Sequence, residues 1–249
     1  MAEPSITAYQ AVTQEQRRAT WRVRHQIYCL GDGGQPLLGC DRPADDPHGD
    51  DNLDSAFQFG ARYRGEVIAT GRLSIASDPW QLPTGQALWR RPTDLRIEPE
   101  CTYSEPGRLG VISRYRETPI GKVVRYRLSG LIMERSLALG FDHFLVKLMP
   151  RLLWSFYWFP WTLVGPETFL PEEGGPLEGD VWPATLNLHE LVLVARRTKM
   201  DFYRLLFPEG AVEEWYDPSR ARPWPELVEL GRRNEHLLAA HGWVRPRTL

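Results

Sequence analysis

The first clear pattern of apolar and polar positions in the chain has a helical period. Apolar side chains recur every three or four residues along this segment: Ala19, Val23, Ile27 and Leu30. Directly before them, residues 13–16 (Thr-Gln-Glu-Gln) have the form of a capping box, in which a hydroxyl at the N-cap is followed three positions later by glutamine. We therefore expect a helix over about 14–29, ended by the glycine-rich stretch 31–34.

Farther along, apolar positions alternate with polar ones, which is the period of a strand. Residues 55–63 and 66–74 form two such runs, and only Arg64 and Gly65 stand between them. Two residues between two alternating runs indicate a β-hairpin.

The segments on either side of the predicted hairpin have no regular period. Residues 31–54 are rich in Gly, Pro and Asp, and a loop of this length in a compact domain is often functional. Residues 75–100 contain four prolines, so we expect an irregular excursion there.

The rest of the chain alternates between strand and helix patterns. In chain order the patterns predict a strand at 108–113, a helix at 122–139, a strand at 143–148, a helix from Pro150, strands at 162–165 and 185–194, and helices at 200–207 and 226–241. This order predicts an α+β fold around one central sheet. We expect residues 1–196 to form the main domain and residues 197–249 a helical extension packed on it.

Composition narrows the class of protein. The chain has 249 residues, of which 42% are hydrophobic and 25% charged, as in ordinary globular proteins. Thirty basic and 32 acidic side chains leave a net charge of −2, which argues against a nucleic-acid partner. Three cysteines without zinc-ligand spacing argue against a disulfide scaffold and fit a reducing cytoplasm.

Neither a targeting signal nor a membrane span is visible. The N-terminal residues have no basic or apolar region of a signal peptide. The most apolar run, 152–164, contains a proline and is too short to cross a bilayer. We expect a cytoplasmic protein that is not an integral membrane protein.

The loop before the hairpin is acidic. Six aspartates fall within 14 positions: Asp41, Asp45, Asp46, Asp50, Asp51 and Asp54. Clustered carboxylates can bind calcium, but the twelve-residue EF-hand pattern is missing. We therefore expect a solvated acidic loop and no metal.

Four short segments occur in order along the chain: 24–28 (Arg-His-Gln-Ile-Tyr), 51–54 (Asp-Asn-Leu-Asp), 67–73 (Val-Ile-Ala-Thr-Gly-Arg-Leu) and 105–111 (Glu-Pro-Gly-Arg-Leu-Gly-Val). With the strand, helix and strand that follow, they make residues 15–195 resemble the acyl-homoserine-lactone synthases, the long-chain N-acyl amino acid synthases and the exosortase-associated acyltransferases. These families are relatives of the GCN5-related N-acetyltransferases. The resemblance therefore implies a mixed central sheet of the acetyltransferase type, flanked by helices.

The resemblance also implies a catalytic pair and a charged acceptor site. It assigns Glu105 as the general base, acting through a water, with Arg108 beside it. It places the acceptor substrate against these side chains: Arg24, Tyr28, Asp51, Asp54 and Arg72. Arginine can clamp a carboxylate and aspartate can hold an ammonium group. An ion-pair network that only orders the loop is the structural alternative.

The donor site departs from the superfamily pattern. Acetyltransferases hold the donor pyrophosphate on a loop of the form Arg/Gln-x-x-Gly-x-Gly/Ala, whereas residues 116–121 are Arg-Glu-Thr-Pro-Ile-Gly. Pro119 removes one N–H donor, which favours acyl carrier protein, with its single phosphate, over coenzyme A. The resemblance implies contacts with the acyl chain and pantetheine from Val111, Ser113, Arg116, Gly121, Trp154 and Trp158. No bound cofactor is expected, because the acyl thioester is a co-substrate.

Two further features have both a functional and a structural interpretation. The segment 152–161 holds six aromatic residues, which could line an acyl pocket, belong to the core, or form the face of a homodimer. A set of basic residues could attract an acidic carrier protein or simply form a solvated helix face: Arg108, Arg114, Arg116, Lys122, Arg125 and Arg127.

We expect an N-acyltransferase that moves a fatty acyl group from acyl carrier protein, or from acyl-CoA, to the amine of an amino acid or similar small metabolite. One alternative is an acyl-homoserine-lactone synthase that uses S-adenosylmethionine. Another is a non-catalytic protein that binds acyl carrier protein, which the altered glycine loop would suit. An ordinary acetyl-CoA acetyltransferase is disfavoured by Pro119.

Overall fold

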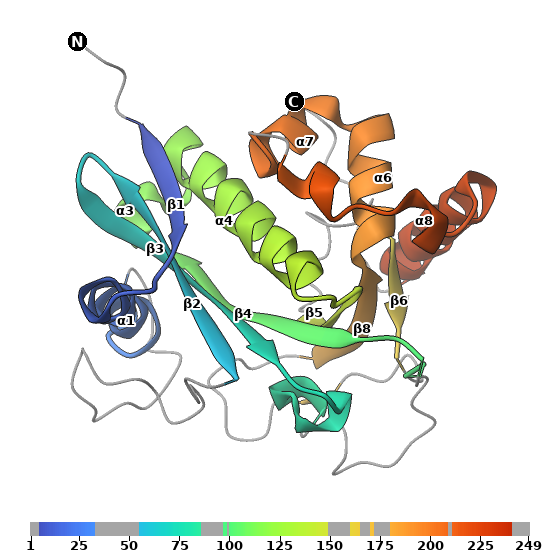
Figure 1. Cartoon of the computed structure of the whole chain (residues 1–249), viewed down its shortest axis with the longest axis horizontal. Coiled ribbons are helices and arrows are strands. Elements are labelled where there is room, and N and C mark those ends of the chain that lie inside the picture. Colours follow the sequence, from blue (N-terminus) through green and yellow to red (C-terminus); the bar gives the residue numbers. More distant parts are fainter. Residues whose placement is uncertain are drawn as a thin grey trace.

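The computed structural model describes residues 5–32, 55–85, 97–98, 100–148, 160–164, 170–171, 180–208 and 211–240 (Figure 1). Its elements in chain order are β1 (Ile6–Gln10), α1 (Gln14–Tyr28), β2 (Ala56–Tyr63), β3 (Glu66–Ile75), η1 (Pro79–Gln81), β4 (Tyr103–Val111), α3 (Ser113–Arg116), α4 (Pro119–Ala138), β5 (His143–Leu148), β6 (Trp161–Leu163), β7 (Leu170–Pro171), β8 (Asp180–Asn187), α6 (Leu188–Thr198), α7 (Met200–Leu206), η3 (Ala211–Glu214), η4 (Pro218–Arg220) and α8 (Trp224–Ala240).

The strands form one mixed sheet in the order β1-β2-β3-β4-β5-β8-β6, and β7 pairs with β8 beside this path. Neighbouring strands are antiparallel except β4 and β5, which are parallel. This sheet, with helices against it and a helical C-terminal segment, confirms the predicted α+β fold.

The parallel pair β4 and β5 touches only at its start. Its register contains just two pairs, Tyr103 with His143 and Ser104 with Phe144. From there on, β4 pairs with β3 and β5 pairs with β8. The two strands therefore separate and leave an opening in the middle of the sheet.

Helices α1 and α4 cover opposite faces of the first four strands (Figure 1). A Cβ atom on Gly60 would lie 3.0 Å from Thr20 of α1, and one on Gly71 would lie 2.9 Å from Ile132 of α4. Both positions need a small residue, since the helices pack directly on the strands. Because side chains alternate between faces, these contacts also define which strand residues lie under α1.

Local sequence signals account for the first elements. Thr13 and Gln16 cap α1 reciprocally, as the capping box predicts. Arg64 and Gly65 have φ values of 52° and 82° in the turn between β2 and β3. Positive φ at both central residues matches the two-residue turn that suits a twisted hairpin, so the predicted hairpin is confirmed.

The predicted strand at 185–194 is wrong, because β8 ends at Asn187 and α6 begins at Leu188. The Asn187 side chain accepts hydrogen bonds from the N–H groups of His189 and Glu190, so it is the N-cap of the helix. The following apolar residues form the buried side of α6 rather than a strand.

Two further boundaries differ from the sequence prediction. β4 begins at Tyr103, five residues before the predicted start, because Pro106 and Gly107 are accommodated within the strand. The short strand β1 has no counterpart in the prediction. The helix predicted from Pro150 lies outside the described residues.

Among the C-terminal helices, α7 packs on α4, α6 on α7 and β8, and α8 on β6. A Cβ atom on Gly130 of α4 would lie 2.0 Å from the carbonyl oxygen of Leu206, so α7 approaches α4 closely at this glycine. Among the described residues, no helix has both the length and the apolar character required to cross a bilayer.

The cysteines differ from the sequence prediction. Cys29 is disulfide-bonded, which the cysteine count did not predict, and Cys101 is a free thiol.

Candidate active site

Polar side chains of two neighbouring strands meet an arginine of α1 on one face of the sheet. The sheet register aligns Gln58 of β2 with Arg72 of β3 and Arg72 with Gly107 of β4. Arg24 of α1 donates a hydrogen bond to Oε1 of Gln58, and both residues are buried. The Arg72 guanidinium lies over Gly107, where a Cβ atom would be 3.3 Å from Nη2. Gly107 thus leaves room for the arginine.

Glu105 lies in the next row of the same face, opposite Ser74 in the register. The side chain is buried, and its Oε2 accepts a hydrogen bond of 2.7 Å from the backbone N–H of Thr84. Burial raises the pKa of Glu105 above the usual range, against the opposing effects of the Thr84 N–H and the positive charge of Arg72. A buried carboxyl with a raised pKa is suited to proton transfer near neutral pH.

A β-bulge follows Glu105 along β4. The register shifts between Thr70 and Arg72, so that Arg108 and Leu109 together face one residue of β3. Arg108 has a φ of 52°, a left-handed conformation that is uncommon for a residue with a side chain. Strained backbone of this kind is found preferentially at functional sites.

Tyr28 connects the end of α1 to this bulge. Its hydroxyl donates a hydrogen bond of 3.1 Å to the carbonyl oxygen of Leu109, and the Arg108 guanidinium lies 5.8 Å from its ring centroid. Burial raises the pKa of Tyr28, although four arginines oppose this effect: Arg108, Arg24, Arg116 and Arg72. Four positive charges therefore act on Tyr28 at this end of the site.

An apolar cavity of about 160 Å³ lies on the other face of the sheet, where β4 and β5 separate. Pro106 and Leu109 of β4 line one side of it, and Phe144 and Val146 of β5 line the other. Helix α4 contributes Tyr126, Ser129, Ile132 and Met133, and α7 contributes Phe202 and Leu206. Trp161 also lines the cavity, and it comes from the aromatic segment 152–161 that was expected to line an acyl pocket or belong to the core. Pro106 and Leu109 lie within the motif segment 105–111. The other lining residues have no local signal for a cavity, because their shared surface is created by the separation of the strands.

The turn after β4 holds three of the residues predicted to contact the donor. The Ser113 N–H and hydroxyl donate to the carboxylate of Asp32, the hydroxyl at 3.0 Å. Arg116 donates to the carbonyl oxygens of Val111 and Asp32 at 3.3 and 3.2 Å. The Gly121 N–H donates to the Thr118 hydroxyl, which is the N-cap of α4. The donor groups of all three residues are therefore hydrogen-bonded to other groups of the protein.

Other predicted residues lie elsewhere. Val111 is buried in the main hydrophobic core. Asp51, Asp54, Trp154 and Trp158 lie outside the described residues, as does most of the acidic loop. Among the described residues, no three His, Cys, Asp or Glu side chains are grouped so that they could hold a metal ion.

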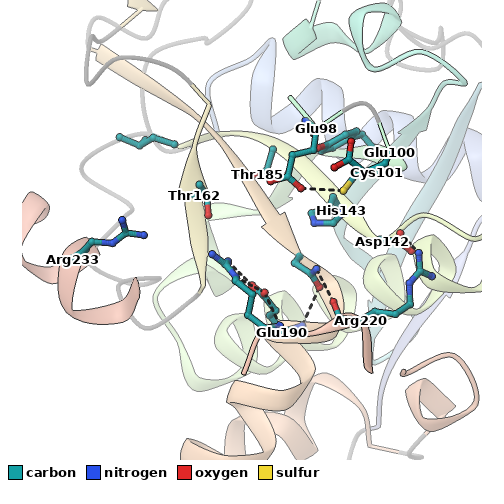
Figure 2. Close-up of a pocket in the computed structure, with 14 residues that line it drawn as sticks. Glu98, Glu100, Cys101, Asp142, His143, Thr162, Thr185, Glu190, Arg220 and Arg233 are labelled. Carbon is teal, nitrogen blue, oxygen red and sulfur yellow. Dashed lines mark hydrogen bonds and ion pairs between the residues drawn. The ribbon is translucent and has the colours of Figure 1, made fainter. Parts of the chain in front are cut away.

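A second, polar cavity of about 680 Å³ lies over β5, β8 and β6 (Figure 2). In this view Thr162 and Thr185 lie between the turn that carries Glu98, Glu100 and Cys101 and the guanidinium of Arg233. Tyr103 also lines the cavity, and it belongs to a small apolar cluster with Leu82, Leu145 and Val164. Glu105 is not among the described residues of its lining.

The buried acids of the polar cavity are neutralised within the protein. Glu190 accepts two hydrogen bonds from the Arg222 guanidinium, of 2.6 and 2.7 Å, and Asp142 forms an ion pair with Arg220. These pairs attach the segment around η4 to β5 and α6. Burial, followed by the nearby Glu98, raises the pKa of Cys101 to about 11, so its thiol stays protonated at neutral pH.

No protein-family model matches the chain, and no curated protein matches it either. Solved structures do match. FeeM, an N-acyl amino acid synthase from uncultured soil microbes, superimposes with a TM-score of 0.54 at 14% identity, over 76% of this chain and 94% of FeeM. The AHL synthase LasI gives a TM-score of 0.56 at 12% identity, over 78% of this chain and 95% of LasI.

BjaI, a CoA-dependent acyl-homoserine lactone synthase solved with SAM and isopentyl-CoA, gives a TM-score of 0.54 at 17% identity, over 93% of this chain and 99% of BjaI. The chain has the fold of these acyl-transferring synthases. The structures therefore confirm the resemblance carried by the four sequence segments. At these identities the likeness concerns the fold, so the activity must be argued from the site.

Proposed function

We propose that the protein transfers an acyl group from a thioester donor to the amine of an amino acid or similar small metabolite. The observation that carries this proposal is the placement of Glu105 and Pro106 where β4 leaves β5. Glu105 lies on the face of the sheet under α1, one row from Arg72, while Pro106 lines the apolar cavity on the opposite face. One strand thus lies between a candidate base and a candidate acyl pocket.

The cavity suits a hydrocarbon chain. Its lining is almost entirely apolar, and each methylene removed from water contributes about 0.8 kcal/mol. A cavity of about 150 Å³ holds a benzene molecule, so the volume here matches a group of about six carbons. A chain that enters the opening between β4 and β5 would bring its thioester carbon to the middle of β4.

The arginines on this face suit the acceptor. Arg24 and Arg72 are buried, and Arg108 lies half-buried beside them, so the site can bind a carboxylate. An amino acid held by its carboxylate would direct its amine toward Glu105. S-Adenosylmethionine also carries an amino acid moiety, so the same argument applies to that acceptor.

The reaction needs one proton acceptor and no bound cofactor. Glu105, directly or through a water, takes a proton from the acceptor amine as its nitrogen attacks the thioester carbon. The carbon–sulfur bond then breaks, and the departing thiolate takes up the proton. Backbone N–H groups displaced from the ladder by the bulge can donate to the carbonyl oxygen as it becomes negative.

Acyl carrier protein is the donor that we favour. Pro119 is the first residue of α4, so the helix begins without the N–H group that the superfamily glycine would supply. Lys122 is exposed and Arg125 half-buried on the same helix, next to the turn, and their charges suit an acidic carrier.

Release of a free thiol tests the proposal. Incubation of the protein with hexanoyl carrier protein and a panel of amino acids should release pantetheine thiol only when an accepted amine is present. Thiol release that is independent of the amine would indicate simple thioester hydrolysis. Binding of the acylated carrier without release over the whole panel would favour a non-catalytic binding protein.

A further inference from the structure

Asp32 places a carboxylate at the turn that follows β4. Its oxygens accept hydrogen bonds from the N–H and hydroxyl of Ser113, and Gln26 adds a bond of 3.1 Å. Burial acts to raise the pKa of Asp32, but the bonds from Ser113 and Gln26 outweigh it and the net pKa is lowered. Asp32 is therefore a carboxylate at neutral pH. It lies 81 positions from Ser113 in the chain, so the fold brings the two together.

The neighbouring donors of this turn are also bonded to the chain's own oxygens. Arg116 donates to the carbonyl oxygens of Val111 and of Asp32 itself. The N–H of Gly121 donates to the Thr118 hydroxyl at 3.2 Å, and Pro119 has no N–H. An anion at this turn would have to displace these bonds and would also meet the negative charge of Asp32.

The turn follows β4 beyond its separation from β5, and Ser113 comes four residues after Leu109, which lines the apolar cavity. A thioester donor whose acyl chain fills the cavity would leave its phosphate end outside the opening between β4 and β5. Coenzyme A carries a diphosphate and a further phosphate there, whereas a carrier protein carries one phosphodiester. The two donors therefore differ most in negative charge where Asp32 lies.

We propose that Asp32 determines donor selectivity, because its carboxylate occupies the Ser113 N–H and hydroxyl and repels the additional phosphates of acyl-CoA. This inference rests on the proposed acyl transfer and deepens it, since it names the residue that separates two donor classes. Asp32 acts on the donor's phosphate end and takes no part in the chemical step.

The chain contains a matched control for Asp32. Asp217 accepts hydrogen bonds from the N–H of Ser219 at 2.9 Å and from its hydroxyl at 2.7 Å, so it is bonded by the same two serine donors, here within a local cap. It caps η4 in the C-terminal segment, far along the chain from the turn after β4. Removing the charge of Asp217 therefore tests the general effect of losing such a cap.

The first experiment compares hexanoyl-CoA and hexanoyl carrier protein as donors for the wild type, Asp32→Asn, Asp32→Ala and Asp217→Asn. We expect kcat/KM for hexanoyl-CoA to rise at least tenfold in both Asp32 variants, mainly through KM. The reason is that the repulsion between the Asp32 carboxylate and the donor grows with the number of phosphate charges brought near it. The value for the carrier protein should change less than about threefold, and Asp217→Asn should leave the ratio of the two donors unchanged. Thermal unfolding verifies that each variant is folded.

The second experiment does not need turnover. Calorimetry on the full chain measures binding of coenzyme A and of 4′-phosphopantetheine, which carries a single phosphate. Asp32→Asn should bind coenzyme A at least tenfold more tightly than the wild type, with little change for phosphopantetheine. Equal affinities of the wild type and Asp32→Asn for coenzyme A would overturn the inference. It would also be overturned if the Asp32 variants lost kcat/KM equally with hexanoyl-CoA and with hexanoyl carrier protein. If the wild type makes no product from either donor, the proposed function fails, while coenzyme A binding still decides the role of Asp32.

Discussion

The backbone N–H of Thr84 donates a hydrogen bond of 2.7 Å to Oε2 of Glu105, so the segment after β3 holds the carboxylate in place on β4. This contact orients the candidate base without neutralising it. Arg72 supplies the nearby positive charge, and burial keeps the pKa of Glu105 raised nonetheless.

Replacing Glu105 with glutamine separates a catalytic role from a structural one. Glutamine can still accept the Thr84 N–H, so we expect a folded protein whose kcat is lower by about 10²–10⁴-fold. The raised pKa means that ionised Glu105 destabilises the folded state above the ordinary carboxyl pKa of about 4.3. Glu105→Gln should therefore have a higher unfolding temperature than the wild type at pH 7, and the difference should disappear below pH 4. A glutamate kept for stability would give the opposite change, and Glu98→Gln, at an exposed position, serves as control.

The pH dependence of the rate should report the Arg72–Glu105 interaction. A general base is active when deprotonated, so the rate should rise with pH through the pKa of Glu105. The positive charge of Arg72 lowers this pKa, and Arg72→Gln should move the acidic limb of the profile to higher pH. Arg62→Gln, at an exposed position of β2, should leave the limb where it is. An acidic limb that does not move would contradict the assignment of Glu105 as the titrating base.

Two positions on α4 should change the preferred acyl chain in opposite directions. Ser129→Leu would fill part of the apolar cavity and Met133→Ala would enlarge it. At about 0.8 kcal/mol per methylene, each should alter kcat/KM for hexanoyl relative to octanoyl donors by about tenfold, toward shorter chains for the first variant and longer chains for the second.

Leu137→Ala provides the control for these variants. Leu137 is buried on the same helix but does not line the cavity, and we expect it to lose about 2–5 kcal/mol of stability without a change in chain preference. If all three variants leave the preference unchanged, the cavity does not hold the acyl chain.

The ion pair of Arg222 with Glu190 should be important for stability. Glu190 is 1% exposed, so Arg222→Ala would leave a buried carboxylate without its guanidinium. We expect a loss of about 2–4 kcal/mol in the free energy of unfolding, measured by urea denaturation, and partial recovery in the double variant with Glu190→Gln. Arg232→Ala removes an exposed pair with Glu229 at 3.7 Å and should cost less than about 0.5 kcal/mol. Equal effects at the two sites would show that the buried pair has no special role.

Local patterns predicted the elements that have a strong period or cap of their own. The capping box at Thr13 and the turn at Arg64 and Gly65 act within a few residues, so the sequence shows them directly. The apolar run after Asn187 fits a buried strand as well as a buried helix, so periodicity alone misplaces the end of β8, although Asn187 is itself a good N-cap.

The partners of the candidate site could not be predicted in this way. Thr84 lies 21 positions from Glu105, Gln58 lies 34 from Arg24, and Asp32 lies 81 from Ser113. Helix α1 and the loops bring these residues together by packing against the sheet, and no local pattern records that packing. The four motif segments marked the charged residues, whereas the carboxylate at the donor turn has no local signature. Of the apolar cavity, the aromatic segment 152–161 indicated only Trp161.

Mass spectrometry of the reaction products tests the central claim most directly. The wild type and Glu105→Gln would be incubated with hexanoyl carrier protein or hexanoyl-CoA, the common amino acids and S-adenosylmethionine. The account predicts an N-hexanoyl amino acid or an N-hexanoyl homoserine lactone with the wild type, and at least a hundredfold less with Glu105→Gln. A folded wild type that forms no acylated amine from either donor, or a Glu105→Gln variant with undiminished turnover, would contradict it.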